Sequence, residues 1–182
     1  MNESVILDPA TGATPAEPST DEHTPADEHA SMLETFRPLF EAAHGVDLKD
    51  AADAERVLRE RLDPESDAAA RLRAELVDLL ERGEIANRGE PPVRWGRAAK
   101  PSPETHGFSI DVVDMTGAGP EHRHPHGEID YCIALEGEPT FDGKPPGWVV
   151  LPEDSTHVPT VAGGRMLIVY LLPDGAIEFT AT

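Results

Sequence analysis

The residues best suited to chemistry in this sequence are gathered in one short stretch in the second half of the chain. Three histidines and two carboxylates stand there at alternate positions, and one more histidine follows further along the chain: His122, His124, His126, Glu128, Asp130 and His157. Neutral imidazole and carboxylate groups together bind divalent ions such as zinc, iron, manganese, nickel or copper. Alternate residues of a strand point to the same face of a sheet, so neighbouring histidines of this stretch can reach one ion. The stretch therefore predicts a metal site.

The order of these residues resembles the metal motifs of the cupins. His122-x-His124-x3-Glu128, followed later by His157, gives the ligands in the expected sequence. Two departures are visible, because the closing glycine of the first motif comes two residues late and Asp154 replaces the usual glycine of the second. Aspartate tolerates turn conformations better than most residues. The resemblance implies a barrel that holds a divalent ion (Fe, Zn, Mn or Ni) through His122, His124, Glu128 and His157.

A shifted register leaves a second ligand set open. His124, His126 and Asp130 as ligands would restore the usual glycine spacing of the first motif. The first set is preferred because glutamate is the commoner carboxylate ligand in cupins. In that register His126 and Asp130 are candidates for moving protons, and Glu104, just before a predicted strand, is a third. The alternative for each is a hydrogen-bonding neighbour of the ligands or a surface group.

The same alternation predicts the faces of the strand that follows. If Glu128 and Asp130 face the ion, Tyr131 faces away from it and Cys132 points inward. Cys132 is then expected to be a small core residue rather than a nucleophile. Trp148 is likewise expected in the core rather than in the wall of an aromatic pocket.

Composition narrows the class of protein. The chain has 182 residues and a formal net charge of -20, which argues against a nucleic-acid or anionic-membrane partner. Cys132 is the single cysteine, so no internal disulfide can form and an intracellular protein is expected. No stretch resembles a membrane span or a signal peptide, and we expect a cytoplasmic protein.

The first half of the chain divides into a tail and a helical part. Residues 1–30 are rich in Pro, Thr, Ala, Asp and Glu, contain no Lys or Arg, and predict a disordered acidic tail. Residues 31–90 carry three amphipathic helical patterns, the second after Asp50 and the third after Ser66. Pro38 is expected to delay or kink the first. This part predicts an α-helical appendage that packs on the core or on a second copy.

Residues 91–182 change to the period of strands. Short runs are separated by glycine and proline signals, among them Val93–Arg97, His106–Met115, Gly147–Pro152 and Met166–Leu172. Many short strands with frequent turns favour a jelly roll. The predicted fold is therefore mainly β, a cupin-type jelly-roll barrel with the helical appendage before it. A homodimer formed through sheet edges is expected, since pairing protects exposed strands.

Several phrases resemble one small cupin family, the 4-hydroxylaminobenzoate lyases of bacterial nitrobenzoate breakdown. The resemblance covers residues 32–180 and rests on seven segments: Phe36–Glu41, Lys100–Ser109, Asp111–Met115, His124–Asp130, Phe141–Gly143, Pro159–Gly164 and Tyr170–Glu178. It implies metal-dependent conversion of 4-hydroxylaminobenzoate, a small aromatic carboxylate, to protocatechuate with release of ammonium.

If the substrate is a benzoate, we expect a cationic side chain in the pocket to bind its carboxylate. A guanidinium suits it best, because it can bind a carboxylate through two parallel hydrogen bonds. The candidates are Arg97, Lys100 and Arg165, which lie on or beside predicted strands, with a surface salt bridge as the alternative for each. Arg97 is preferred because it ends a strand close to the segment that holds Glu104.

Two other functions remain open on the sequence. One is a different metal-dependent cupin enzyme, such as a ring-cleaving dioxygenase, which would consume oxygen during turnover. The other is a non-catalytic cupin that binds a small molecule, which would bind its ligand tightly without turnover in metal-replete protein.

Overall fold

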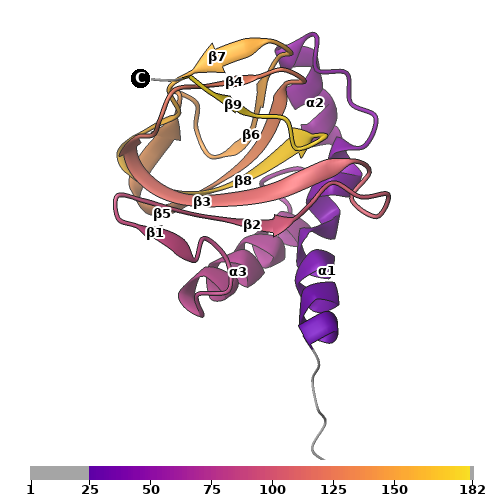
Figure 1. The fold of residues 1–182 in the computed structure, drawn as a ribbon, viewed down its shortest axis with the longest axis vertical. Coiled ribbons are helices and arrows are strands. Elements are labelled where there is room, and N and C mark those ends of the chain that lie inside the picture. Colours follow the sequence, from indigo (N-terminus) through magenta and orange to yellow (C-terminus); the bar gives the residue numbers. More distant parts are fainter. Residues whose placement is uncertain (1–24, 181–182) are drawn as a thin grey trace, which may run out of the picture.

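The chain folds into a helical layer followed by a β-barrel (Figure 1). The computed structural model describes residues 25–180, so most of the predicted acidic tail lies outside the described residues. The helices are α1 (Pro25–Ala43), α2 (Ala51–Arg61) and α3 (Asp67–Glu81). The strands are β1 (Arg88–Glu90), β2 (Val93–Ala99), β3 (Phe108–Ala118), β4 (His122–His124), β5 (Glu128–Phe141), β6 (Gly147–Leu151), β7 (Ser155–His157), β8 (Thr160–Pro173) and β9 (Glu178–Phe179).

The second and third helices begin where the sequence predicts. The side chain of Asp50 accepts hydrogen bonds from the first backbone N–H groups of α2, and Ser66 does the same for α3. The first helix differs from the prediction, because it begins at Pro25 and not at residue 31. Proline suits a first helical turn, where its missing N–H has no partner to lose. The helix also continues through Pro38, whose neighbours Leu39 and Phe40 are fully buried against the rest of the molecule.

Two sheets form the barrel. The larger has the strand order β1-β2-β3-β8-β5-β6, and the smaller has the order β7-β4-β9. The helices lie outside the larger sheet (Figure 1), and their apolar side chains share one core with its outer face. Trp148 of β6 belongs to this core, where its indole N–H donates a hydrogen bond to the carbonyl oxygen of Leu62 at 2.9 Å. These contacts confirm a mainly β jelly roll with an N-terminal helical appendage.

The inner face of the larger sheet carries a second, smaller core. Cys132 and Tyr170 lie in it, whereas Tyr131 points to the helices, as the alternation predicts. The pairing of β5 with β8 sets Asp130 opposite Tyr170 and so fixes which side chains enter the barrel. Glu128, at the start of β5, lies on the same inner face. In residues 25–180 no helix is long and apolar enough to cross a membrane.

Candidate metal centre

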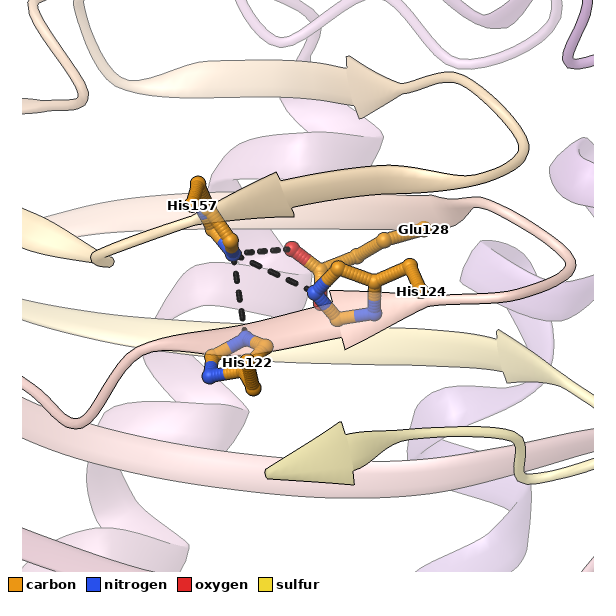
Figure 2. Close-up of side chains that lie close together, drawn as sticks. All are labelled: His122, His124, Glu128 and His157. Atoms are coloured by element: carbon orange, nitrogen blue, oxygen red, sulfur yellow. Dashed lines mark hydrogen bonds and ion pairs between the residues drawn. The ribbon is translucent and has the colours of Figure 1, made fainter. Parts of the chain in front are cut away.

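Four side chains from three strands converge inside the barrel (Figure 2). The Nε2 atom of His157 lies 3.0 Å from Nε2 of His122 and 3.2 Å from Nε2 of His124. The Nε2 atom of His124 lies 2.9 Å from Oε2 of Glu128. One ligand atom from each residue can be chosen so that all four lie within 4.8 Å of one another. These are the four ligands that the preferred register predicts.

Hydrogen bonds to the outer ring nitrogens show which way the imidazole lone pairs point. His122 Nδ1 lies 2.9 Å from the carbonyl oxygen of Pro120, and His157 Nδ1 lies 2.6 Å from Oδ2 of Asp142. Both acceptors take the proton on Nδ1, so the two Nε2 atoms lie 3.0 Å apart with their lone-pair directions toward each other. A metal ion or a proton between them would satisfy both nitrogens.

The separations also fit a bound ion. Two atoms bound to one centre at about 2.1 Å, and at right angles to each other, lie about 3.0 Å apart. The three short distances in the cluster are 2.9, 3.0 and 3.2 Å. Nitrogen and carboxylate oxygen are the donors that borderline divalent metals prefer. The cluster can therefore hold a divalent metal ion after small shifts of its side chains.

Burial sets the protonation of the cluster. Loss of hydration lowers the pKa of His122 and of His124 to about 4, so both rings are neutral near pH 7. Burial raises the pKa of Glu128 to about 8, and burial together with the charge of Glu128 raises that of Asp130 well above its usual value. The short contact between His124 and Glu128 is therefore not an ion pair. Within the described residues the oxygens of both carboxyl groups have no polar neighbours at hydrogen-bonding distance except each other and the ring nitrogen of His124, and a cation would satisfy them.

Asp142 orients His157 of the cluster, and the sequence alone did not predict this role. Its Oδ2 accepts from His157, while its Oδ1 accepts a hydrogen bond from the backbone N–H of Thr160 at 2.8 Å. It follows β5 with φ +49°, a turn conformation that aspartate tolerates. A carboxylate behind a metal-binding histidine fixes the ring and raises its basicity. The Asp142-Gly143 pair marks a turn in the sequence, but only the fold shows that the turn lies beside His157.

The shifted register does not form in the structure. His126 is 52% exposed, and its Nδ1 lies 3.1 Å from Oδ2 of Asp174, outside the barrel. The reason is the turn between β4 and β5, where Gly127 has φ +81° and a side chain at that position would meet the backbone of Leu151 at 3.0 Å. The turn interrupts the alternation of the strand, so His126 does not follow His124 inward.

The other two predicted proton carriers have opposite placements. Asp130 is fully buried on the inner face, two residues beyond Glu128, and is coupled to it electrostatically. Glu104 is exposed in the loop before β3, where its charge acts on Arg37 of α1. The structure thus leaves Asp130 beside the cluster and removes His126 and Glu104 from it.

A cavity of about 500 Å³ adjoins the cluster and includes His122 in its wall. Its surface is mostly apolar and is contributed by the inner face of β2, β3 and β8 and by the segment that contains β9. Tyr170 of β8 is in its lining and is 6% exposed. The cavity is also lined by Arg88, Trp95, Arg97, Asp111, Met115 and Phe179.

The three predicted carboxylate-binding cations are engaged or outside this cavity. Arg97 lines it, but its Nε and one terminal nitrogen donate to the two oxygens of Asp111 at 2.7 and 3.1 Å. Arg165 is held in the same way by Asp114 at 2.7 and 2.9 Å and also donates to Glu136. Lys100 is exposed and does not line the cavity.

The jelly-roll barrel and its converging histidines and glutamate define a cupin with a cluster able to bind a divalent metal ion. The sequence model of the family described as 4-hydroxylaminobenzoate lyase (PnbB) matches residues 39–179. The chain belongs to this family.

Two relatives carry the name of this family. A protein named 4-hydroxylaminobenzoate lyase from Pseudomonas putida is 30% identical over 146 residues, which covers 70% of this chain and 83% of the relative. One of the same name from Nocardioides sp. (strain LMS-CY) is 30% identical over 140 residues, covering 71% and 83%. Similar solved structures include an RmlC-like cupin protein from Ralstonia eutropha JMP134, with 17% identity, a TM-score of 0.39 and coverage of 50% of this chain and 62% of that one. KdgF from Halomonas sp. has 21% identity, a TM-score of 0.33 and coverage of 47% and 84%.

Proposed function

We propose that the protein is a metal-dependent lyase that converts 4-hydroxylaminobenzoate to protocatechuate with release of ammonium. The observation that carries the proposal is the buried cluster of three histidines and Glu128 at the wall of a mostly apolar cavity, in a member of this family. The reaction consumes one water and needs no external oxidant, because the N–O bond is reduced while the ring carbon is oxidised.

The residues His122, His124, Glu128 and His157 would hold the ion. When bound, a divalent cation supplies a Lewis acid that polarises the hydroxylamino oxygen. Asp142 keeps the His157 ring in the tautomer and orientation that present Nε2 to the centre. The backbone carbonyl of Pro120 does the same for His122.

The cavity supplies the binding surface for the aromatic ring. Met115, Tyr170 and Phe179 present apolar area, and enclosure of the ring there removes water from its faces. His122 connects this surface to the cluster. A para-substituted ring whose nitrogen lies near His122 therefore places its carboxylate end toward the rest of the cavity.

Protons are handled by Asp130 and Tyr170 in this proposal. Burial and the nearby carboxyl groups of Glu128 and Asp130 raise the pKa of the Tyr170 phenol well above its usual value, so Tyr170 stays a hydrogen-bond donor. Asp130 opposes Tyr170 across the β5–β8 pair, and burial raises its pKa, which favours the protonated form that can donate a proton. The departing hydroxylamino oxygen takes up a proton and leaves as water. One water then adds to the ring carbon next to the one that carries the nitrogen, and a second water hydrolyses the imine, which yields the catechol and ammonia with a net uptake of one water.

The test is anaerobic incubation of the metal-loaded protein with 4-hydroxylaminobenzoate in water enriched in oxygen-18. We expect equimolar protocatechuate and ammonium, with solvent oxygen in both ring hydroxyl groups. A dioxygenase would instead depend on dissolved oxygen. Tight binding without any product in metal-replete protein would identify a binding protein, and either result would contradict the proposal.

A further inference from the structure

Two arginines line the cavity beside the metal cluster, Arg88 and Arg97. The sequence position of Arg97 favours it as the carboxylate anchor, yet its Nε and one terminal nitrogen already donate to the two oxygens of Asp111. Asp111, which holds it, also accepts a hydrogen bond from Ser109 at 2.7 Å and lies opposite Arg97 across β2 and β3. A ligand carboxylate at Arg97 would therefore meet the charge of Asp111 as well, and the two would repel.

Arg88, unlike Arg97, stacks its guanidinium on an aromatic ring and is not paired with a carboxylate of the described residues. Its guanidinium carbon lies 5.4 Å from the centre of the Trp95 ring, and the two residues face each other across the antiparallel pair β1–β2. Within residues 25–180 no carboxylate oxygen lies within 4.0 Å of its nitrogens, although the chain carries 35 acidic and 15 basic residues. Acidic residues are abundant, so the lack of a partner at Arg88 is not due to their scarcity.

Stacking on Trp95 holds the guanidinium in place and leaves its N–H groups available in the plane of the fork. Gly89 permits this contact, because a side chain there would come within 3.3 Å of the indole ring. Trp95 is itself 48% exposed and forms part of the same cavity. An oriented, unpaired guanidinium next to an apolar surface suits one class of ligand, a planar aromatic monocarboxylate.

We infer that Arg88, stacked on Trp95, binds the substrate carboxylate at this cavity and that Arg97 does not. The assignment rests on the proposed function in its choice of a benzoate. It deepens that function by naming the residue that distinguishes aromatic acids from neutral aromatic compounds. The carboxylate would accept two parallel hydrogen bonds from Arg88 while the ring lies against the apolar wall.

Calorimetric binding of two unreactive probes, 4-aminobenzoate and 4-aminobenzamide, to the metal-loaded protein tests the inference. The wild type should prefer the acid. Arg88→Gln should weaken the acid about 10- to 100-fold, less than for a fully buried ion pair because Arg88 is exposed, and change the amide less than about 2-fold. Arg88→Lys should recover part of the loss, since an ammonium cannot reproduce the fork.

Two matched variants complete the design. Arg94→Gln removes the same charge from the neighbouring strand outside the cavity lining, and should leave both affinities unchanged. The double variant Arg97→Gln/Asp111→Asn removes the arginine without leaving the Asp111 charge unpaired in the cavity wall, and should alter the acid and the amide to the same degree. A carboxylate-selective loss in this double variant without one in Arg88→Gln would overturn the inference. So would equal losses of both probes in Arg88→Gln, or a wild type that does not prefer the acid.

Failure of the proposed reaction can be distinguished from failure of the carboxylate assignment to Arg88. If the wild type forms no protocatechuate from 4-hydroxylaminobenzoate while Arg88→Gln still loses the acid selectively, the reaction is wrong and the carboxylate site stands. If protocatechuate forms and the selectivity of Arg88→Gln is unchanged from wild type, the reaction stands and the carboxylate site is wrong.

Discussion

The two faces of strand β5 have opposite chemistry although their residues alternate along the same backbone. Ile129 and Tyr131 point to the helices and pack into an apolar core. Glu128 and Asp130 point into the barrel, where they are equally buried and, among the described residues, have only each other and the ring of His124 as polar neighbours at hydrogen-bonding distance. Burial of apolar groups stabilises a fold, whereas burial of unpaired carboxyl groups destabilises it. The outer face therefore stabilises the fold, whereas the carboxyl groups of the inner face destabilise it and belong to a cluster able to bind a cation.

Loss of a ligand on the inner face should have the largest effect on activity. His157→Ala removes a nitrogen that lies within 3.2 Å of both other histidines, and we expect bound metal to fall and activity to drop by at least about 1000-fold, more than for loss of an orienting residue. The fold should persist, because His157 lies in a short strand outside the main cores. Metal analysis and anaerobic turnover measure this. His126→Ala is the matched control, and loss of metal in that variant would favour the shifted register.

A truncation in the core that covers the outer face should lower stability and leave metal binding unchanged. Leu58 of α2 is fully buried in the core shared by helices and sheet. Leu58→Ala should reduce the free energy of unfolding by about 2 to 5 kcal/mol, because it leaves a cavity in that core. Metal stoichiometry of the folded protein should stay the same. Urea unfolding combined with metal analysis tests both parts, and metal loss at full foldedness would show that the two faces are coupled.

Asp142→Asn changes the cluster inside the barrel without removing any of its four residues. The amide keeps the acceptor for the Thr160 N–H but no longer accepts from His157, so the ring loses its orienting partner. We expect metal affinity to fall about 10- to 100-fold. A competitive chelator titration measures it. Asp174→Asn, which removes the partner of His126, should bind metal like the wild type.

Tyr170→Phe removes one hydroxyl from the cavity and should leave metal content unchanged. If the phenol donates a hydrogen bond to the reacting groups, kcat should fall about 10- to 100-fold with little change in KM. Steady-state kinetics of metal-replete variants check this. A rise in KM alone would instead make Tyr170 part of the ring-binding surface.

The pH dependence of the metal-free protein should show the smallest effect. His122 and His124 have pKa values lowered from 6.5 to about 4, so the unfolded state binds more protons in that range and stability falls as pH drops through it. Glu128 has a pKa raised from 4.5 to about 8, so its contribution to stability is lost as pH rises toward 8. Between pH 6.5 and 8 this loss amounts to about 2 kcal/mol. Urea unfolding should show this loss of unfolding free energy in the wild type and much less of it in Glu128→Gln. If the unfolding free energy of both proteins depends equally on pH, the raised pKa does not belong to Glu128.

The sequence predicted much of this arrangement because local spacing determines much of it. The alternation of His122 and His124, the capping residues Asp50 and Ser66, and the inward placement of Cys132 are all local properties of a strand or helix. The barrel and the ligand set follow from them together with the resemblance to a known family.

What the sequence could not predict depends on strand pairing. Arg97 was the preferred anchor, but the register of β2 with β3 sets Asp111 opposite it and engages its fork. Asp142 reaches His157 only because a turn and a later strand meet at the barrel wall. Arg88 lines the cavity from β1, a three-residue edge strand that is too short to show an alternating pattern in the sequence. Each of these contacts joins residues far enough apart in sequence that spacing carries no information about them.

The central claim is that the inner-face cluster holds the ion on which lyase chemistry depends, and reconstitution tests it most directly. Metal-free protein is titrated with a divalent ion under anaerobic conditions, and protocatechuate formation from 4-hydroxylaminobenzoate is followed at each addition. We expect no product without metal and a rate that rises in proportion to bound metal, with saturation at one ion per chain. Product formation by the metal-free protein, or a requirement for oxygen in the metal-loaded protein, would contradict this account.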